Sequence, residues 1–137
     1  MEKLKINHLA VWILVILFQG ISLLWYSQWL FASKWMELVG KSAEDFMGAS
    51  PFFYIVPIIG AIALYYLMAW LFRELNVTSI GKGILLSFLF WLCFLFLMAF
   101  TNDLFSLYPI TLTLINKGNY LVCFLLGGIL LSTWKRK

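Results

Sequence analysis

The side chains able to do acid–base, nucleophilic or metal chemistry are few in this sequence and stand far apart. Cys93 and Cys123 each lie in an apolar run without a second Cys, His or acidic residue at ligand spacing, which predicts two buried small side chains and neither a disulfide framework nor a metal site. His8 is the single histidine, and no acidic residue stands near it at helical spacing within its apolar run. The sequence therefore predicts no catalytic residue, no metal and no cofactor.

Polar side chains inside the long apolar runs form two stripes at helical spacing. Because a polar group in lipid is costly, such a stripe is expected to face another helix or a cavity. The first stripe consists of His8, Trp12, Gln19, Ser22 and Tyr26. The second stripe consists of Thr113, Asn116, Tyr120, Cys123 and Gly127. We expect the two stripes to face each other or to line a common cavity.

Gln19 and Ser22 are the polar members of the first stripe that lie deepest in its run. Gln19 is a candidate contact for a ligand or an ion, but an amide at this depth more often makes an interhelical hydrogen bond, worth about 0.6 to 2 kcal/mol. The Ser22 hydroxyl can also bond to the backbone of its own helix. We keep both as candidate cavity residues and favour the structural interpretation.

Aromatic and polar side chains are expected to converge where the first run ends and the last one begins. The members of this outer mouth are Trp25, Tyr26, Trp35, Asn116, Lys117 and Tyr120. Aromatic walls with a few polar groups are typical of ligand pockets. The alternative is an aromatic belt at the membrane interface with a lysine that reaches into water. In the pocket interpretation, Lys117 pairs with Asp103 or Glu37, or attracts an anion.

The elements that must hold these residues are membrane spans. The chain has 137 residues, of which 64% are hydrophobic and only 12% charged, against roughly 25% charged in ordinary soluble domains. Its apolar runs reach the length of about 20 residues that crossing a bilayer requires. We predict a single all-α domain, residues 1–137, with four transmembrane helices. They span about residues 8–30, 51–72, 80–102 and 109–134. The first has no small-residue cleavage site, so we predict that it is not a cleaved signal peptide.

The first outer loop is predicted to carry a short amphipathic or helical segment. Residues 34–39 continue the helical pattern until Gly40, a typical helix end, and Ser42 with Asp45 resembles a capping box that opens a further short helix.

The distribution of Lys and Arg predicts the orientation, since positively charged short segments stay cytoplasmic. Seven basic residues fall at the two termini and in the second-to-third loop: Lys3, Lys5, Arg73, Lys82, Lys135, Arg136 and Lys137. Three fall on the other side: Lys34, Lys41 and Lys117. Both termini are therefore expected in the cytoplasm. No basic helix face with interleaved aromatic residues is present, so nucleic acid is not an expected partner.

Motifs near both ends of the chain resemble a family of small bacterial membrane proteins. The residues that carry the resemblance are Trp25-Tyr26-Ser27, Leu30-Phe31, Lys34-Trp35, Gly40 and Glu44-Asp45 near the N-terminus, and Leu114-Ile115-Asn116, Gly118, Gly127, Ile129 and Trp134 near the C-terminus. The family is the domain of unknown function seventeen sixty-one. Gln28 stands where that family often has proline, and Asn119 where it often has an aromatic residue. The resemblance implies a four-span protein of the bacterial cell (inner) membrane with no established activity.

Three function classes follow. We favour a non-enzymatic interaction module that binds lipid or a small ligand and works as a homo-oligomer, with membrane lipids as its first partners. The alternative is a small oligomeric transporter or channel, although no carboxylate lies in mid-span for proton coupling. The third is an outward-facing membrane enzyme built on the acidic residues of the outer side, which have no nucleophile with an evident base beside them. Those acidic residues are Glu37, Glu44, Asp45 and Asp103.

Overall fold

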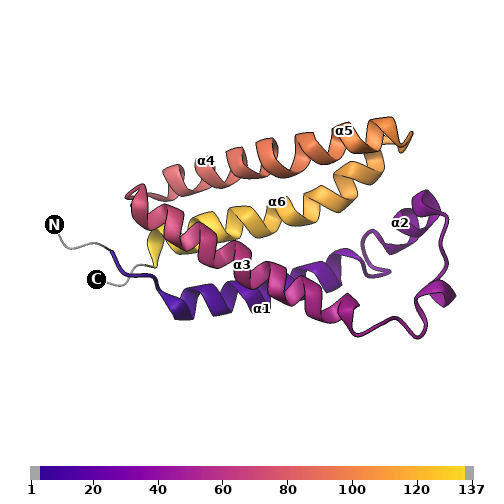
Figure 1. The fold of residues 1–137 in the computed structure, drawn as a ribbon, viewed down its shortest axis with the longest axis horizontal. Coiled ribbons are helices and arrows are strands. Elements are labelled where there is room, and N and C mark those ends of the chain that lie inside the picture. Colours follow the sequence, from indigo (N-terminus) through magenta and orange to yellow (C-terminus); the bar gives the residue numbers. More distant parts are fainter. Residues whose placement is uncertain (1–3, 135–137) are drawn as a thin grey trace.

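The computed structural model describes residues 4–134, and its regular elements are helices (Figure 1). In chain order they are α1 (His8–Trp25), α2 (Ala32–Val39), the 3₁₀ turn η1 (Ala43–Phe46), α3 (Phe52–Glu74), α4 (Ile80–Phe90), the π-helical segment η2 (Trp91–Phe96), α5 (Leu97–Phe105) and α6 (Ile110–Thr133). The basic tail residues Lys3, Lys135, Arg136 and Lys137 lie outside the described range.

Within residues 4–134, four helical rods are long and apolar enough to cross a membrane: α1, α3, the continuous rod α4–η2–α5 (Ile80–Phe105), and α6. The predicted all-α fold with four spans is confirmed. Asn7 and Trp134 meet at one end of the bundle, where the Asn7 Nδ2 donates to the Trp134 carbonyl oxygen at 3.2 Å. We call this the terminal end. The opposite end, which carries α2 and η1, is the loop end (Figure 1).

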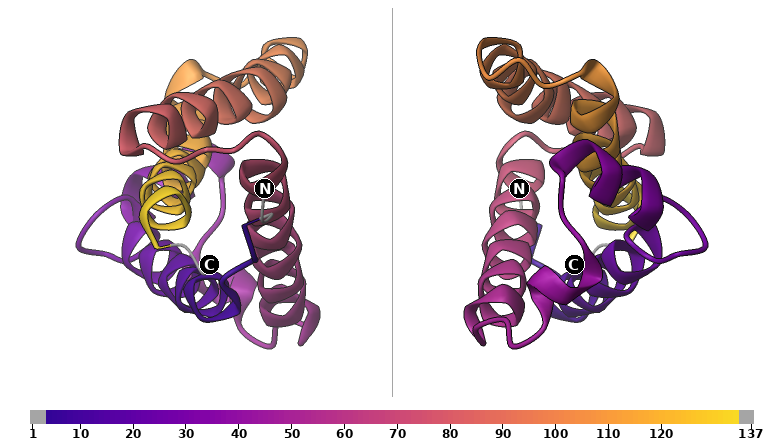
Figure 2. Two further views of the ribbon diagram at one scale, coloured as in Figure 1. Left: turned by 90° about the vertical axis from the view of Figure 1, so that its left-hand side faces the viewer. Right: turned by 90° about the vertical axis from the view of Figure 1, so that its right-hand side faces the viewer.

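Helix α6 is the central element of the bundle. It packs against α1, α3, α4 and α5, and α1 packs in addition against α3. In the end-on views, α6 lies between α1 and the α4–η2–α5 rod (Figure 2). The sequence argument that the first and last spans are neighbours is therefore confirmed.

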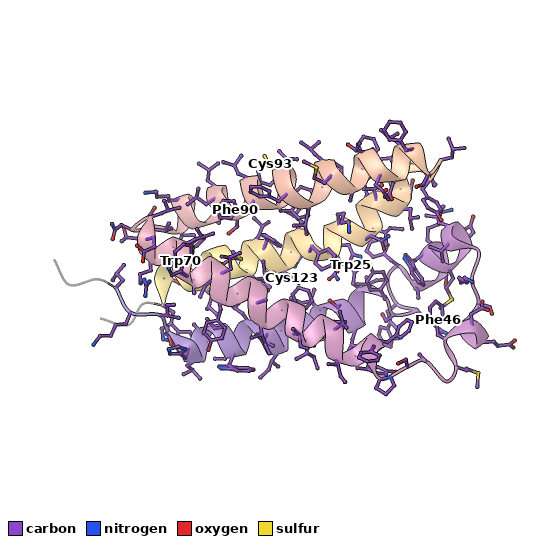
Figure 3. All side chains as sticks on the ribbon, viewed as in Figure 1. Trp25, Phe46, Trp70, Phe90, Cys93 and Cys123 are labelled. Atoms are coloured by element: carbon purple, nitrogen blue, oxygen red, sulfur yellow. The ribbon has the colours of Figure 1, made fainter. Side chains whose placement is uncertain are left out.

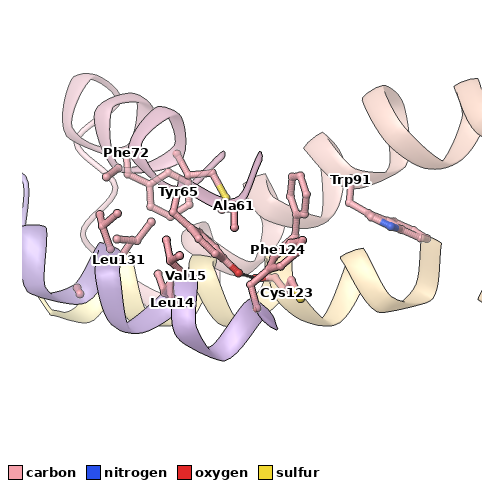
Figure 4. Packing of buried hydrophobic residues seen from close by; sticks show 14 of the residues in the cluster. Leu14, Val15, Ala61, Tyr65, Phe72, Trp91, Cys123, Phe124 and Leu131 are labelled. Atoms are coloured by element: carbon pink, nitrogen blue, oxygen red, sulfur yellow. Dashed lines mark hydrogen bonds between the residues drawn. The ribbon is translucent and has the colours of Figure 1, made fainter. Parts of the chain in front are cut away.

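The apolar core lies toward the terminal end, between α1, α3 and α6. Tyr65 is the largest fully buried side chain, and its hydroxyl donates to the Cys123 carbonyl oxygen at 3.0 Å (Figure 4). That bond satisfies a phenolic group which lipid could not. Cys123 is buried and free, as its place in the run predicted. Cys93 is free but exposed on the surface of η2, so the prediction that it is buried is wrong.

Helices α4 and α6 cross with their backbones in contact. A Cβ atom on Gly83 would collide with the Gly128 carbonyl oxygen, and one on Gly128 would collide with the Ser87 hydroxyl. Each helix carries a second small residue four positions beyond its glycine, Ser87 on α4 and Ser132 on α6. Small residues at this spacing let membrane helices approach closely, so that dispersion contacts hold them where hydrophobic burial cannot. Sequence analysis did not identify this crossing.

Two helix ends differ from the sequence prediction. Helix α1 ends at Trp25 and not near Leu30, because the chain turns at Ser27, whose hydroxyl donates to the Leu24 carbonyl oxygen at 2.7 Å. The third span runs on to Phe105, so that Asp103 lies inside its last turns and not beyond its end. The last span, by contrast, begins and ends within one residue of the prediction.

The first outer loop folds as its sequence indicates. Gly40 ends α2 in the left-handed conformation with φ 66°, which costs glycine no Cβ clash. The Ser42 amide then donates to the Asp45 carboxylate at 2.7 Å, completing the expected capping box. It opens a 3₁₀ turn only, η1, and the predicted helical segment of the loop is α2.

Candidate functional site

Asn116 joins three elements at the loop end. Its Oδ1 accepts one hydrogen bond from the Tyr26 hydroxyl and one from the Trp35 Nε1, both at 2.9 Å. The Tyr26 and Trp35 rings meet edge to face, with centroids 5.7 Å apart, and the Phe46 ring of η1 also packs against Trp35, with centroids 5.7 Å apart. Asn116 therefore ties α6 to the end of α1 and to the outer loop.

Two further indoles hold the backbone of the same α6 turn. The Trp25 Nε1 donates to the Ile115 carbonyl oxygen at 2.8 Å, and the Trp91 Nε1 donates to the Lys117 carbonyl oxygen at 2.7 Å. Trp25 lies beside α6 in Figure 3 and packs tightly on Gly118, where a Cβ would stand 3.0 Å from the indole ring. The turn from Ile115 to Gly118 is thus fixed from opposite sides by α1 and η2.

Asn119 is a buried polar residue that sequence analysis did not include in either stripe. Its Nδ2 donates to the Ser22 hydroxyl at 3.0 Å, so the contact expected between the stripes is made here. Its Oδ1 is buried without a hydrogen-bond partner among the described residues. The sequence offered one indication of its role, which is its residue type: an amide side chain inside an apolar span needs a polar partner.

The first stripe divides between two neighbours. Ser22 and Tyr26 face α6, but the Gln19 Nε2 donates to the Pro57 carbonyl oxygen of α3 at 3.4 Å, a long hydrogen bond. His8 lies 3.0 Å from the Tyr66 hydroxyl, also on α3, while Asn7 caps the helix. At Gln19 and His8 the first stripe therefore does not face the last span, because α1 packs against both α3 and α6.

The charged residues of the loop end do not form the expected pairs. Asp103 accepts a hydrogen bond from the Thr113 hydroxyl at 2.6 Å, and Glu37 pairs with Lys34 at 3.0 Å. Lys117 instead lies over the ring of Tyr120, with its Nζ 5.3 Å from the ring centroid. Within residues 4–134, no group of three or more His, Cys, Asp or Glu side chains is placed to hold a metal ion.

An apolar groove runs beside this cluster, between α3 and the α4–η2–α5 rod, with α6 as its floor. Its inner part has a volume of about 480 Å³ and is walled by α3 residues and by Phe90, Phe94 and Leu95. Its outer part has a volume of about 320 Å³ and ends at Val56 and Pro57 on α3 and at Tyr120 on α6. The two parts share Leu64, Leu95 and Phe124. We refer to both parts together as the groove.

The residues predicted to form one outer mouth are thus divided between two places, a hydrogen-bonded cluster on α6 and the groove. Trp25, Tyr26 and Trp35 point inward and serve as hydrogen-bond donors to α6, whereas Tyr120 lines the groove. Asn116 lies on the side of α6 that faces α1 and α2. Phe90 of α4 and Phe94 of η2 line the groove, whereas Trp91 is only 7% exposed.

Comparison with known proteins gives a family and no function. Residues 9–132 match the family described as "Protein of unknown function (DUF1761)". The chain matches no curated protein and no solved structure.

Proposed function

The chain belongs to this DUF1761 family of proteins of unknown function, and we propose that it is a non-enzymatic lipid-binding module of the membrane whose groove holds an acyl chain. The observation that carries the proposal is the groove itself, an apolar channel between two spans that diverge from each other. Its larger part exposes apolar surface only. Volumes of about 480 and 320 Å³ fall in the range of roughly 300 to 1,000 Å³ that is usual for ligand sites.

The length of the groove fits an acyl chain. Along α3 it extends from Val56 to Leu71, a distance of about 23 Å at 1.5 Å per residue. Half of the hydrocarbon thickness of a bilayer is about 15 Å, so a lipid tail fits lengthwise with its carboxyl end toward Tyr120. An unfilled groove would forfeit the dispersion contacts of its walls, and acyl chains are the molecules at hand in the membrane to supply them.

Orientation and assembly complete the proposal. The basic residues of the whole sequence favour a cytoplasmic terminal end, which places Tyr120 and the outer part of the groove toward the outer leaflet of a bacterial cell membrane. The apolar surface around the groove is also large enough for contact with a second copy of the chain, as a homo-oligomer requires. A second copy is therefore the competing occupant of the groove.

Photocrosslinking in lipid tests this function. The full chain is reconstituted in phosphatidylcholine vesicles that contain a trace of phosphatidylcholine with a diazirine on its acyl chain, and the labelled residues are mapped by mass spectrometry. We expect the label to concentrate at the groove residues Leu64, Phe94 and Phe124. Leu67→Trp, at a groove position that is 53% exposed, should fill the groove and reduce this label several-fold.

The matched control is Leu85→Trp, the same change at a position on α4 that is 56% exposed and outside the groove. It should leave the label at the groove residues unchanged. Label spread evenly over all lipid-facing positions, with no difference between the two variants, contradicts an acyl-chain site. Crosslinks from the groove to a second copy in place of lipid assign it to an oligomer contact.

A further inference from the structure

The residue next to the outer end of the groove is a lysine, and its charge is not neutralised by the protein. Lys117 is half-buried one helical turn before Tyr120, and its ammonium lies over the ring of that groove residue, 5.3 Å from the centroid. Among the described residues no carboxylate lies within ion-pair distance of it, since Glu37 is paired with Lys34 and Asp103 accepts from Thr113.

The backbone below this ammonium is held in place. The Trp91 indole donates to the Lys117 carbonyl oxygen, Asn116 accepts from Tyr26 and Trp35, and Gly118 packs against Trp25. These contacts use only backbone or neighbouring groups, so the Lys117 side chain is left for another partner. A side chain presented from a fixed turn loses less entropy on binding than one from a mobile loop.

The depth of Lys117 matches a lipid headgroup. From Lys117 to the end of α6 at Thr133 the helix measures about 24 Å, somewhat less than the roughly 30 Å of hydrocarbon. A lysine stem can bridge the remaining distance and place its ammonium at the level of the phosphates. The groove therefore has an apolar body and a cationic outer end, which is the complement of an anionic amphiphile.

We propose that Lys117 binds the headgroup phosphate of an anionic phospholipid whose acyl chain lies in the groove, so that the site prefers phosphatidylglycerol to phosphatidylcholine. This inference rests on the proposed lipid-binding function and adds its headgroup selectivity. A cation adjacent to anionic lipid contributes about 1 kcal/mol, which corresponds to about a fivefold preference.

The test compares two diazirine lipids with identical acyl chains, one a phosphatidylglycerol and one a phosphatidylcholine, each as a trace in phosphatidylcholine vesicles. In the natural sequence we expect groove residues to be labelled about fivefold more by phosphatidylglycerol. Lys117→Gln should abolish that preference while phosphatidylcholine still labels the groove, and Lys117→Arg should retain it. Lys41→Gln, the same charge change at an exposed residue of the same end, should have no effect on the preference.

The outcomes separate the two proposals. Equal labelling by both lipids, or a preference that survives Lys117→Gln, overturns the headgroup site and leaves the acyl-chain function standing. A groove labelled by neither lipid overturns both. Inorganic phosphate, added in excess at constant ionic strength, should not displace the lipid. A preference that disappears under this competition shows that Lys117 takes free phosphate and contradicts the assignment to lipid.

Discussion

The two halves of the bundle are held together by different forces. Toward the terminal end, α1, α3 and α6 bury apolar side chains against one another, and α4 meets α6 backbone to backbone at Gly83 and Gly128. Toward the loop end, residues 52–60 of α3 are all exposed, and α6 receives hydrogen bonds from tryptophan and tyrosine side chains.

The difference shows how a membrane protein can be both rigid and open. In lipid, separating two apolar surfaces costs little, since the tails are as apolar as the side chains; close packing and hydrogen bonds are what hold helices together. Packing fixes the terminal half. At the loop half, directional bonds fix one turn of α6, while the first turns of α3 stay exposed. The groove lies between α3 and the α4–η2–α5 rod and extends along both halves.

The substitution with the largest expected effect disrupts the helix packing of the terminal half. Gly83→Ala places a Cβ against the Gly128 carbonyl oxygen, which as part of a helix backbone cannot move aside. We expect a loss of about 3 kcal/mol in the free energy of unfolding, the upper part of the range for overpacking. Unfolding in mixed micelles with increasing denaturing detergent measures it.

Gly81→Ala is the control for that variant, because a Cβ at Gly81 meets no atom within 4 Å. It should leave the protein as stable as before or stabilise it by up to about 1 kcal/mol, since alanine is the better helix residue. Equal effects of the two substitutions would show that the α4–α6 contact does not hold the terminal half together.

A smaller loss of stability is expected when the loop half loses the hydrogen-bond acceptor Asn116. Asn116→Leu leaves the Tyr26 hydroxyl and the Trp35 indole without a partner, at a cost of about 2 kcal/mol. Amide hydrogen exchange should then accelerate in α2 and remain slow in the terminal half. Asn102→Leu, at an exposed asparagine of α5, is the control and should change neither quantity. Faster exchange throughout α6 would mean that the two halves are not separate.

The smallest effect concerns the outer loop, which belongs to neither half. Hydrogen bonds from the Ser42 amide and hydroxyl hold the pKa of the Asp45 carboxyl below its usual value of 3.8. Because the folded pKa is the lower one, the cap is fully formed above pH 3.8 and is lost as the pH falls through the folded value. Hydrogen exchange of the Ser42 amide should accelerate in that acidic range, without a change in global stability. Asp45→Asn should remove the pH dependence.

The sequence predicted the elements better than their contacts. Residue types alone located the four spans, the Gly40 helix end and the Ser42–Asp45 cap, because each depends on composition or on neighbours within a few positions. They did not reveal the π-helical turn that carries Trp91, nor the partner of Asn119. The contacts of both are made between residues far apart along the chain, Trp91 with Lys117 and Asn119 with Ser22.

What the sequence by itself determined is the solvent and the secondary structure: 64% hydrophobic residues in four long runs require lipid and form helices there. Tertiary structure alone decided which polar side chains become hydrogen-bond partners. The spacing of Gln19, Ser22 and Tyr26 placed them on one face, yet that face touches α3 at Gln19 and α6 at the other two. Helical periodicity gives the direction of a side chain around its own axis. Crossing angles and the divergence of neighbouring helices determine what the side chain meets, and they come from close packing such as that of Gly83 on Gly128.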